Sequence, residues 1–300
     1  MPIFSIDNQE MDSIEQSEFK LEKELQSLIE KNLGVVFNCR FVATEFTTGP
    51  VHSGRIDSLA LSEDNNPVII EYKKVESSDL INQSLFYLSW INDHRGDFEI
   101  AAQKSLGNDI EVDWSDVRVI CIAPNYKKYD LHAVQVMGAN IELWSYRLFN
   151  NSTLYLDEVF RRNTNKANSK SINVNKKQNV QIDYSVDERL EGKPEPIREL
   201  FYMAQEYIIS LDSAIDEIPR KNYVAYKTSQ NIVCIEVQKG RIFIYVKINP
   251  KTLPDLPTTG TDVSNTGHFG TGDLQLDVKT EADLEIAKPF IKMAYQKVGG

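Results

Sequence analysis

Apolar residues in the segment 18–33 recur at the spacing of an α-helix. Five positions lie together on one face of such a helix: Leu21, Leu25, Leu28, Ile29 and Asn32. Charged residues fill most of the other positions, and Gly34 follows where the helix is expected to end. The pattern therefore predicts an amphipathic helix that buries one face against the body of the protein.

The next three apolar segments are predicted to be strands. Residues 35–46 and 55–62 form the first two, and residues 63–67, Glu-Asp-Asn-Asn-Pro, are dense in turn formers. Residues 68–73 then run Val-Ile-Ile-Glu-Tyr-Lys, a nearly continuous apolar stretch that ends in charge. A strand that is apolar on both faces is typical of the buried centre of a sheet.

The remainder of the first half alternates helices and strands. Residues 77–79, Ser-Ser-Asp, supply an N-cap for a helix over residues 80–92. A buried strand, a helix and two more strands are expected over residues 117–123, 130–140, 141–149 and 153–160. This order of elements predicts an α/β domain, a mixed sheet with helices on its faces, over residues 1–160.

The composition of the chain changes after residue 160. Between Arg161 and Lys177 there are six basic residues and no acidic ones, so we interpret residues 161–195 as a basic, polar, flexible linker. Residues 196–300 form a smaller α+β domain, a candidate recognition or oligomerisation module. Its expected elements are a helix over 197–217, strands over 223–227, 232–237 and 241–248, a Gly/Thr/Asp-rich loop over 254–273, a short strand and a helix over 280–297.

The net charge and the lack of export signals restrict the class of protein. The formal net charge is −11 at pH 7, which repels nucleic acid unless cations gather at the binding site. No apolar run approaches the roughly 20 residues of a membrane span. The start has no signal-peptide pattern, and the three cysteines have neither disulfide nor zinc spacing. We therefore expect a cytoplasmic protein without membrane contact.

The candidate chemistry lies in the hairpin formed by the second and third strands. A turn centred near Asp64 places Asp57 across from Glu71, and side chains directly opposed in such a pair have Cβ atoms about 4.5–5.5 Å apart. Two facing carboxylates repel, and a divalent cation between them removes the repulsion. Hard ions such as Mg²⁺ take one or two carboxylates together with water and phosphate. The sequence thus predicts a metal site at Asp57 and Glu71.

Lys73 lies two positions beyond Glu71, so strand alternation places both side chains on one face. There its ammonium group would position or deprotonate the attacking water and offset the charge of a pentavalent phosphate. A metal ion held by two carboxylates, with an ammonium group beside it, suits phosphodiester hydrolysis, in which positioning and charge stabilisation provide most of the catalysis.

Asp57, with Glu71-Tyr72-Lys73 beginning fourteen positions later, resembles the motif of the PD-(D/E)XK nuclease superfamily. The segments Gly-Arg-Ile-Asp and Ile-Ile-Glu-Tyr-Lys-Lys most resemble those of bacterial and archaeal members near the NucS-type branch. Ile56 replaces the proline that usually precedes the first acid. The C-terminal half resembles an uncharacterised domain found beside such nucleases and in bacterial defence proteins.

The resemblance implies a restriction-endonuclease-like fold and a metal-dependent endonuclease that hydrolyses DNA with Mg²⁺ or Mn²⁺. It implies further site residues: the Tyr72 carbonyl as a metal ligand, Glu22 (with Glu24 as the neighbouring candidate) on the N-terminal helix, and Gln83 on the helix after the motif, with Tyr87 one turn later. It also implies a role in restriction, phage defence or repair. Many members dimerise to cut both strands, and the sequence leaves open whether this chain forms a homodimer.

A second class of function stays open at this point. The chain would then be a nucleic-acid- or nucleotide-binding regulatory protein that keeps the nuclease fold without turnover. Joint retention of Asp57, Glu71 and Lys73 disfavours this alternative, because a protein without catalysis has no need of opposed carboxylates. The choice between DNA and RNA, and the strandedness of the substrate, also stay open.

Overall fold

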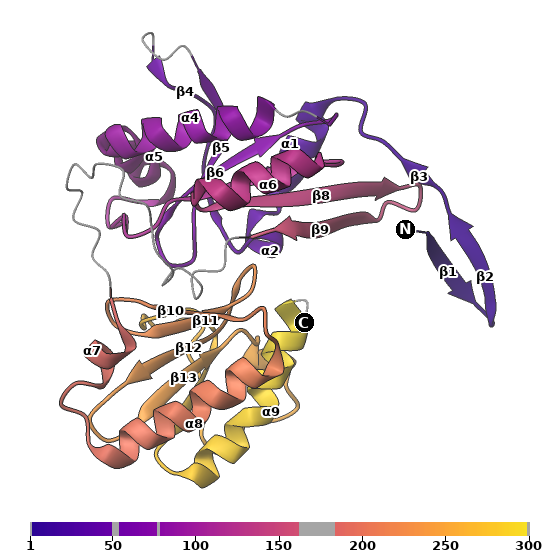
Figure 1. The fold of residues 1–300 in the computed structure, drawn as a ribbon. Coiled ribbons are helices and arrows are strands. Elements are labelled where there is room, and N and C mark those ends of the chain that lie inside the picture. The colour runs from indigo at the N-terminus through magenta and orange to yellow at the C-terminus, as the bar shows by residue number, and fades with distance from the viewer. Residues whose placement is uncertain (1, 50–53, 77–78, 162–183, 299–300) are drawn as a thin grey trace. The chain divides into compact units, whose positions relative to one another are not determined.

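The computed structural model describes residues 2–49, 54–76, 79–161 and 184–298. By its internal contacts the chain divides into two units, residues 1–162 and 163–300. Figure 1 shows both units, which are described separately below. The expected N-cap at residues 77 and 78 and the linker residues 162–183 lie outside the described residues.

The first unit is built on a seven-stranded mixed sheet. Its centre is parallel, because β6 pairs in parallel with β7 and β7 with β8, whereas β4, β5 and β6 form an antiparallel meander. Every residue of β6 and of β7 is buried, as their continuous apolar sequences require. The strands in sheet order are β3 (Gln16–Ser17), β8 (Ile141–Phe149), β7 (Arg118–Ala123), β6 (Pro67–Tyr72), β5 (Arg55–Leu61) and β4 (Arg40–Thr47), and β9 (Leu154–Phe160) also pairs with β8.

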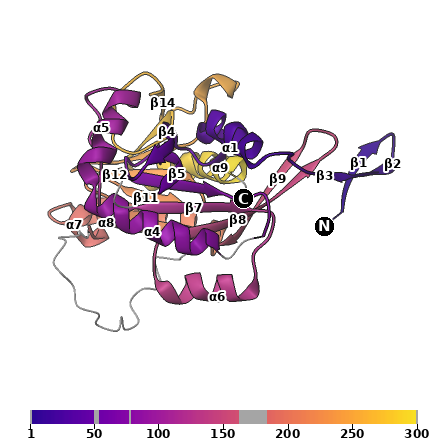
Figure 2. The same cartoon turned by 90° about the horizontal axis from the view of Figure 1, so that it is seen from above.

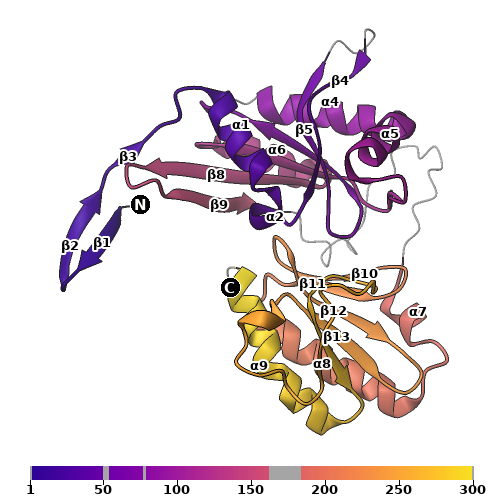
Figure 3. The same cartoon turned by 180° about the vertical axis from the view of Figure 1, so that it is seen from behind.

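Helices cover both faces of this sheet, as the pattern predicted. On one face α1 and α2 pack through Leu25, Ile29 and Leu33 against alternate residues of the central strands. On the other face lie the helices that follow β6 and β7. Figures 1 and 3, which view the molecule from opposite sides, bring α6 and then α1 to the front. The helices are α1 (Glu22–Lys31), α2 (Leu33–Val36), α4 (Asp79–Asp93), α5 (Arg95–Leu106) and α6 (Lys128–Met137).

The structure shifts several of the predicted element boundaries. The first helix begins at Glu22 rather than at residue 18, because the Glu24 carboxylate accepts the N–H groups of Lys20 and Leu21 and so caps its start. This helix ends at Lys31 rather than near Gly34, which lies inside α2, and the strand predicted over residues 35–46 begins only at Arg40. The helix predicted over residues 130–140 ends at Met137, because Gly138 takes a left-handed conformation with φ 68°.

Besides α2 and the short strand β3, two larger features of the first unit have no counterpart in the sequence prediction. A hairpin of β1 (Ile3–Asp7) and β2 (Glu10–Ile14) projects from the N-terminus, as Figures 1 and 2 show. Helix α5 also escaped prediction, because its apolar residues spread around the helix and Phe98 and Ala102 alone are buried. Both segments lack the periodic stripe on which a sequence prediction depends.

A buried ion pair crosses the centre of the same sheet. Arg118 of β7 donates to both carboxylate oxygens of Glu142 of β8, at 2.6 and 2.7 Å, and each side chain is almost fully enclosed. The guanidinium group matches the carboxylate in a bidentate arrangement, which is the strong form of such a pair. The sheet therefore buries two glutamates in different settings, Glu142 with a cation bonded to it and Glu71 without one.

The second unit is an antiparallel sheet with two long helices on one face. Helices α8 and α9 carry Leu200, Ile208 and Ile291 into the core they share with the strands, and Figure 3 shows them side by side. A short helix within the segment expected to be linker, α7, adds Leu190 to this core. The elements are α7 (Val186–Leu190), α8 (Glu195–Leu211), β10 (Asp216–Pro219), β11 (Val224–Lys227), β12 (Asn231–Val237), β13 (Ile242–Val246), β14 (Gly260–Asp262), β15 (Leu274–Val278) and α9 (Glu281–Val298).

The helix predicted over residues 197–217 is too long at its C-terminal end. It stops at Leu211, and residues 216–219 turn back as strand β10 to pair with β11. Residues of the expected loop over 254–273 likewise contribute the edge strand β14. In the part of the chain that the structure describes, no helix combines the length and apolarity needed to cross a membrane.

Candidate active site

Asp57 and Glu71 meet where the pairing of β5 with β6 ends. The regular ladder ends with Ser58 opposite Ile70, which makes Asp57 and Glu71 the next facing positions. The backbone N–H of Asp57 donates to Glu71 Oε1 at 3.0 Å, and the backbone N–H of Tyr72 donates to Asp57 Oδ2 at 3.1 Å. The carboxylates thus accept N–H groups in place of backbone carbonyls, and the structure places the two acids together as the hairpin register predicted.

The environment of these acids disfavours their negative charge. Glu71 is fully buried, and its Oε2 atom has no hydrogen-bond partner. Burial, and then the negative charge of Asp57, raise the pKa of Glu71 well above its usual value. Burial also raises the pKa of Asp57, although the Tyr72 N–H and the charge of Lys73 act against this. The pair therefore holds protons more readily than free carboxylic acids do, and a cation bound between the two acids would stabilise their ionised forms.

Lys73 follows β6 directly and shares the site with Glu22. Its ammonium nitrogen lies 3.4 Å from Glu22 Oε1, and the second Glu22 oxygen accepts the backbone N–H of Lys74 at 2.8 Å. Glu22 opens α1, so this helix brings a third carboxylate to the strand end. The neighbouring candidate, Glu24, caps α1 instead. Of the two, Glu22 lies beside the predicted site and Glu24 does not.

Helix α1 also holds the backbone of β5 through Gln26. The buried Gln26 amide donates to the Asp57 carbonyl at 2.7 Å and to Thr44 Oγ1 at 3.1 Å. One turn later Glu30 accepts from Ser58 at 2.7 Å. The sequence analysis did not single out Gln26, because a polar residue on an amphipathic helix looks like a surface residue until the strand beneath it is known.

Gln83 reaches the site indirectly, through Tyr87. Its amide donates to the Tyr87 hydroxyl at 3.0 Å. That hydroxyl donates to the Arg55 carbonyl at 2.8 Å and accepts the Arg55 N–H at 3.1 Å. Gly54 allows this approach, since a Cβ there would lie 2.8 Å from the Tyr87 ring. The structure therefore connects Gln83 and Tyr87 to the backbone two residues before Asp57.

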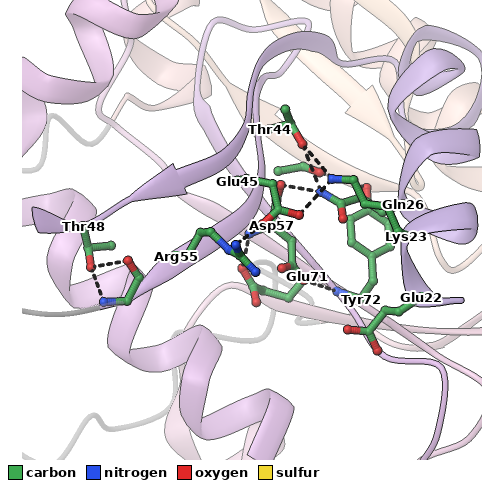
Figure 4. Close-up of polar contacts among 12 residues, drawn as sticks. Glu22, Lys23, Gln26, Thr44, Glu45, Thr48, Arg55, Asp57, Glu71 and Tyr72 are labelled. Carbon is green, nitrogen blue, oxygen red and sulfur yellow. Dashed lines mark hydrogen bonds and ion pairs between the residues drawn. The ribbon is translucent and has the colours of Figure 1, made fainter.

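On the β4 side of Asp57 lies a group of charges that the sequence analysis missed. Glu45 falls opposite Asp57 between two paired positions of β4 and β5. Its carboxylate accepts from Lys23 at 2.8 Å and pairs with Arg55 at 2.5 Å. Figure 4 shows Glu45 close to Asp57 and Glu71, with Lys23 and Arg55 as its partners. The β4–β5 register would have revealed it, but a one-residue shift near Ala43 hides that register in the sequence.

The donor set at Asp57 and Glu71 fits a hard divalent ion. Glu71 Oε2 is a buried oxygen without a partner, and both carboxyl groups carry raised pKa values. Among the described residues, no cluster of three or more His, Cys, Asp or Glu side chains is arranged to hold a metal. Two carboxylates, completed by a backbone carbonyl, water and phosphate, still suit Mg²⁺, which usually keeps several waters.

Comparison with solved structures gives partial matches. The chain resembles the EndoMS-dsDNA2 complex with a TM-score of 0.31 and 19% identity, over 44% of this chain and 48% of that one. It resembles EndoMS in apo form with a TM-score of 0.30 and 20% identity, over 42% and 46%. A repair endonuclease from Pyrococcus abyssi matches with a TM-score of 0.23 and 18% identity, over 42% and 48%. Each match spans less than half of the solved chain.

Sequence comparison covers nearly the whole chain. Residues 186–298 match a domain of unknown function, DUF5655, which corresponds to the second unit from α7 to α9. An uncharacterized protein of Haemophilus influenzae is 30% identical over 303 aligned residues, which cover 98% of this chain and 99% of the relative. The alignment with this relative therefore covers both units in the same order, and the chain belongs to the same family as this Haemophilus influenzae protein.

Proposed function

We propose that this protein is a metal-dependent nuclease that hydrolyses phosphodiester bonds in DNA. The observation that carries the proposal is the facing pair of Asp57, which is half-buried, and Glu71, which is fully buried and whose Oε2 atom has no hydrogen-bond partner, because the charges of this pair are unfavourable without a cation. A purely structural role gives no reason to enclose two carboxylates side by side in a sheet. Placement beside Lys73 adds the positive charge that phosphoryl transfer requires.

Asp57 and Glu71 would hold Mg²⁺ or Mn²⁺, with the Tyr72 carbonyl as a third protein ligand. The ion supplies Lewis acidity to the scissile phosphate and makes water more acidic. Lys73 donates hydrogen bonds to the attacking water and to the phosphate, and so offsets the charge that develops on oxygen. Glu22 keeps the Lys73 ammonium at the strand end through their 3.4 Å contact. Gln83 acts through Tyr87 by fixing the backbone of Arg55.

DNA is the proposed substrate, with cleavage inside a strand and a place in restriction, phage defence or repair. The second unit, which matches DUF5655, would select the substrate or form a homodimer. The net charge of −11 implies that binding depends on the few cations around the site and on the metal. The cytoplasm is the proposed location.

The test is a cleavage assay on plasmid, single-stranded and modified DNA and on RNA, with Mg²⁺, Mn²⁺ or EDTA. Wild type is compared with Glu71→Gln and Lys73→Ala, and with Glu111→Gln as a control at an exposed carboxylate. The proposal requires metal-dependent cutting that both site variants lose and the control keeps. Binding without cutting on every substrate, unchanged in the site variants, would favour a regulatory nucleic-acid-binding protein.

A further inference from the structure

The charged group on the β4 side of Asp57 has features that a simple surface ion pair does not explain. Glu45 has a φ of 52°, in the left-handed region that a glutamate rarely occupies within a strand. Such a conformation costs free energy and persists where surrounding contacts impose it, which occurs most often at functional sites. The register places Glu45 next to Asp57, which itself faces Glu71. Three carboxylates therefore follow one another across β4, β5 and β6.

Two cations from different elements meet on the Glu45 carboxylate. Lys23 of α1 donates to Oε1 at 2.8 Å, and Arg55 of β5 pairs with Oε2 at 2.5 Å. Both cations remain open to solvent, with side-chain exposures of 50% and 65%. The Glu45 carboxylate thus pairs with two cations, and the three side chains together keep a net positive charge at the rim of an otherwise acidic site.

The backbone of Arg55 is fixed even though its side chain is exposed. Its N–H and its carbonyl both bond to the buried Tyr87 hydroxyl, at 3.1 and 2.8 Å. Lys23 is similarly fixed, since it lies in the first turn of α1 beside Glu22, which contacts Lys73. The two cations are therefore anchored at their backbones, and their side chains are held over the site by Glu45.

We propose that Arg55 and Lys23 bind a phosphodiester group of the nucleic-acid substrate, next to the one that is cut, and that Glu45 occupies the position of this phosphate in the free protein. This inference rests on the proposed nuclease function. The Arg fork and the Lys point charge suit phosphate as well as carboxylate, because both present oxygens to the donors. The Lys23 and Arg55 side chains are exposed although the Glu45 carboxylate is partly covered, so both cations can turn from Glu45 to a phosphate without leaving solvent.

Binding of a phosphate by Arg55 and Lys23 would also explain how a protein with a negative net charge binds a polyanion. Glu22, Glu45, Asp57 and Glu71 surround the site, and a polyanion would approach four carboxylates. Arg55 and Lys23 supply two positive charges on the β4 side, while Lys73 supplies one on the β6 side. A phosphate on Arg55 and Lys23 would place the following phosphate beside Asp57, which is two residues from Arg55.

The test is the salt dependence of duplex DNA binding, measured by fluorescence anisotropy with Ca²⁺ in place of Mg²⁺ or Mn²⁺, with a gel control that the duplex stays intact. Each phosphate contact contributes about −0.9 to the slope of log K against log salt. The Lys23→Ala/Arg55→Ala variant should flatten that slope by about one unit and weaken binding at low salt. Arg55→Lys alone should keep the slope near that of wild type, because the charge remains. Glu45→Gln should tighten binding, and Glu111→Gln should not.

Unchanged slope and affinity in Lys23→Ala/Arg55→Ala, with folding confirmed by the thermal transition, would overturn the inference while wild-type cleavage still supports the nuclease. Tighter binding by Glu45→Gln that is equalled by Glu111→Gln would also overturn it, because net charge alone would then explain the effect. If wild-type protein neither binds nor cuts any nucleic acid, this inference and the proposed function both fail.

Discussion

Replacement of Glu71 by glutamine is expected to stabilise the metal-free protein at neutral pH. Glu71 is fully buried and lies against Asp57, so its carboxyl group holds its proton more tightly in the folded chain than in the unfolded one. Glutamine has nearly the same shape, and its Oε1 atom can still accept the Asp57 N–H that Glu71 now accepts at 3.0 Å. The change therefore removes the need either to bury a charge or to bind a proton on folding, and it keeps the hydrogen bond.

The sign and size of the effect follow from proton linkage. Because the pKa of Glu71 is raised on folding, the native state binds more protons than the unfolded state between the usual pKa and the raised one. The wild-type free energy of unfolding should thus fall as pH rises through this window, by up to about 1.4 kcal/mol per pH unit for one proton. Below the usual pKa the effect disappears. Asp57 acts in the same direction and leaves a residual slope in the variant.

The assay is urea unfolding followed by tryptophan fluorescence between pH 4 and pH 8, a window that spans the usual glutamate pKa of about 4.3. All three tryptophans, Trp90, Trp114 and Trp144, lie in the first unit, so the signal reports the unit that contains the site. A saturating divalent ion, at about 100 times its Kd, should restore roughly 2.7 kcal/mol to wild type at neutral pH. Glu71→Gln should gain much less from the ion.

Glu142→Gln provides a matched control in the same sheet. Its carboxylate is also buried, but Arg118 bonds to both of its oxygens, at 2.6 and 2.7 Å. Removing that charge leaves a buried guanidinium group without its partner, which costs about 3–5 kcal/mol. The two variants should therefore change stability in opposite directions. A Glu71→Gln protein that is less stable than wild type at every pH, or a difference that does not vary with pH, would refute the reasoning.

Three further predictions concern the surroundings of the site. Lys73→Ala should reduce cleavage by about two orders of magnitude or more, because it removes a group that stabilises transition-state charge. Its Mn²⁺ affinity, measured by calorimetry, should stay within a few-fold of wild type, and loss of metal binding would contradict the role given to Lys73. Gly54→Ala should destabilise the first unit by about 1–3 kcal/mol, because the added Cβ lies 2.8 Å from the Tyr87 ring. A melting temperature equal to that of wild type would show that the close contact between Gly54 and the Tyr87 ring is not needed. Gln26→Leu should cost about 1–3 kcal/mol by leaving the Asp57 carbonyl and other acceptors unpaired, and a variant as stable as wild type would argue against this helix-to-strand contact.

Much of the fold could be predicted from the chain because its signals are local. The apolar run of β6 and the turn formers after β5 indicate a buried hairpin without knowledge of any other element. Their lengths also determine the register, and so the sequence alone places Asp57 across from Glu71. By contrast, helix α5 and the β1–β2 hairpin could not be predicted, because neither carries an apolar stripe of regular period.

The candidate site likewise combines residues whose proximity the sequence predicts with residues that only tertiary contacts bring together. Asp57 and Glu71 face each other within one hairpin and Lys73 directly follows it, so strand register and turn length suffice to predict that the three lie near one another. Glu22 could be proposed by resemblance, but the choice between Glu22 and Glu24 depends on which of them caps α1. Gln26, Glu45 and Arg55 gain their roles from contacts between α1, β4 and β5, and those contacts join residues that are distant in the sequence.

The sequence by itself determined the alternation of helices and strands, the buried centre of the first sheet and the facing pair of acids, because periodicity and turn chemistry act over a few residues. Only the tertiary structure decided that Glu71 is left with a buried oxygen lacking a partner, and that Glu45 gathers Lys23 and Arg55 beside it. Burial and electrostatic environment depend on every element packed around a group, and no local pattern of residues records that sum.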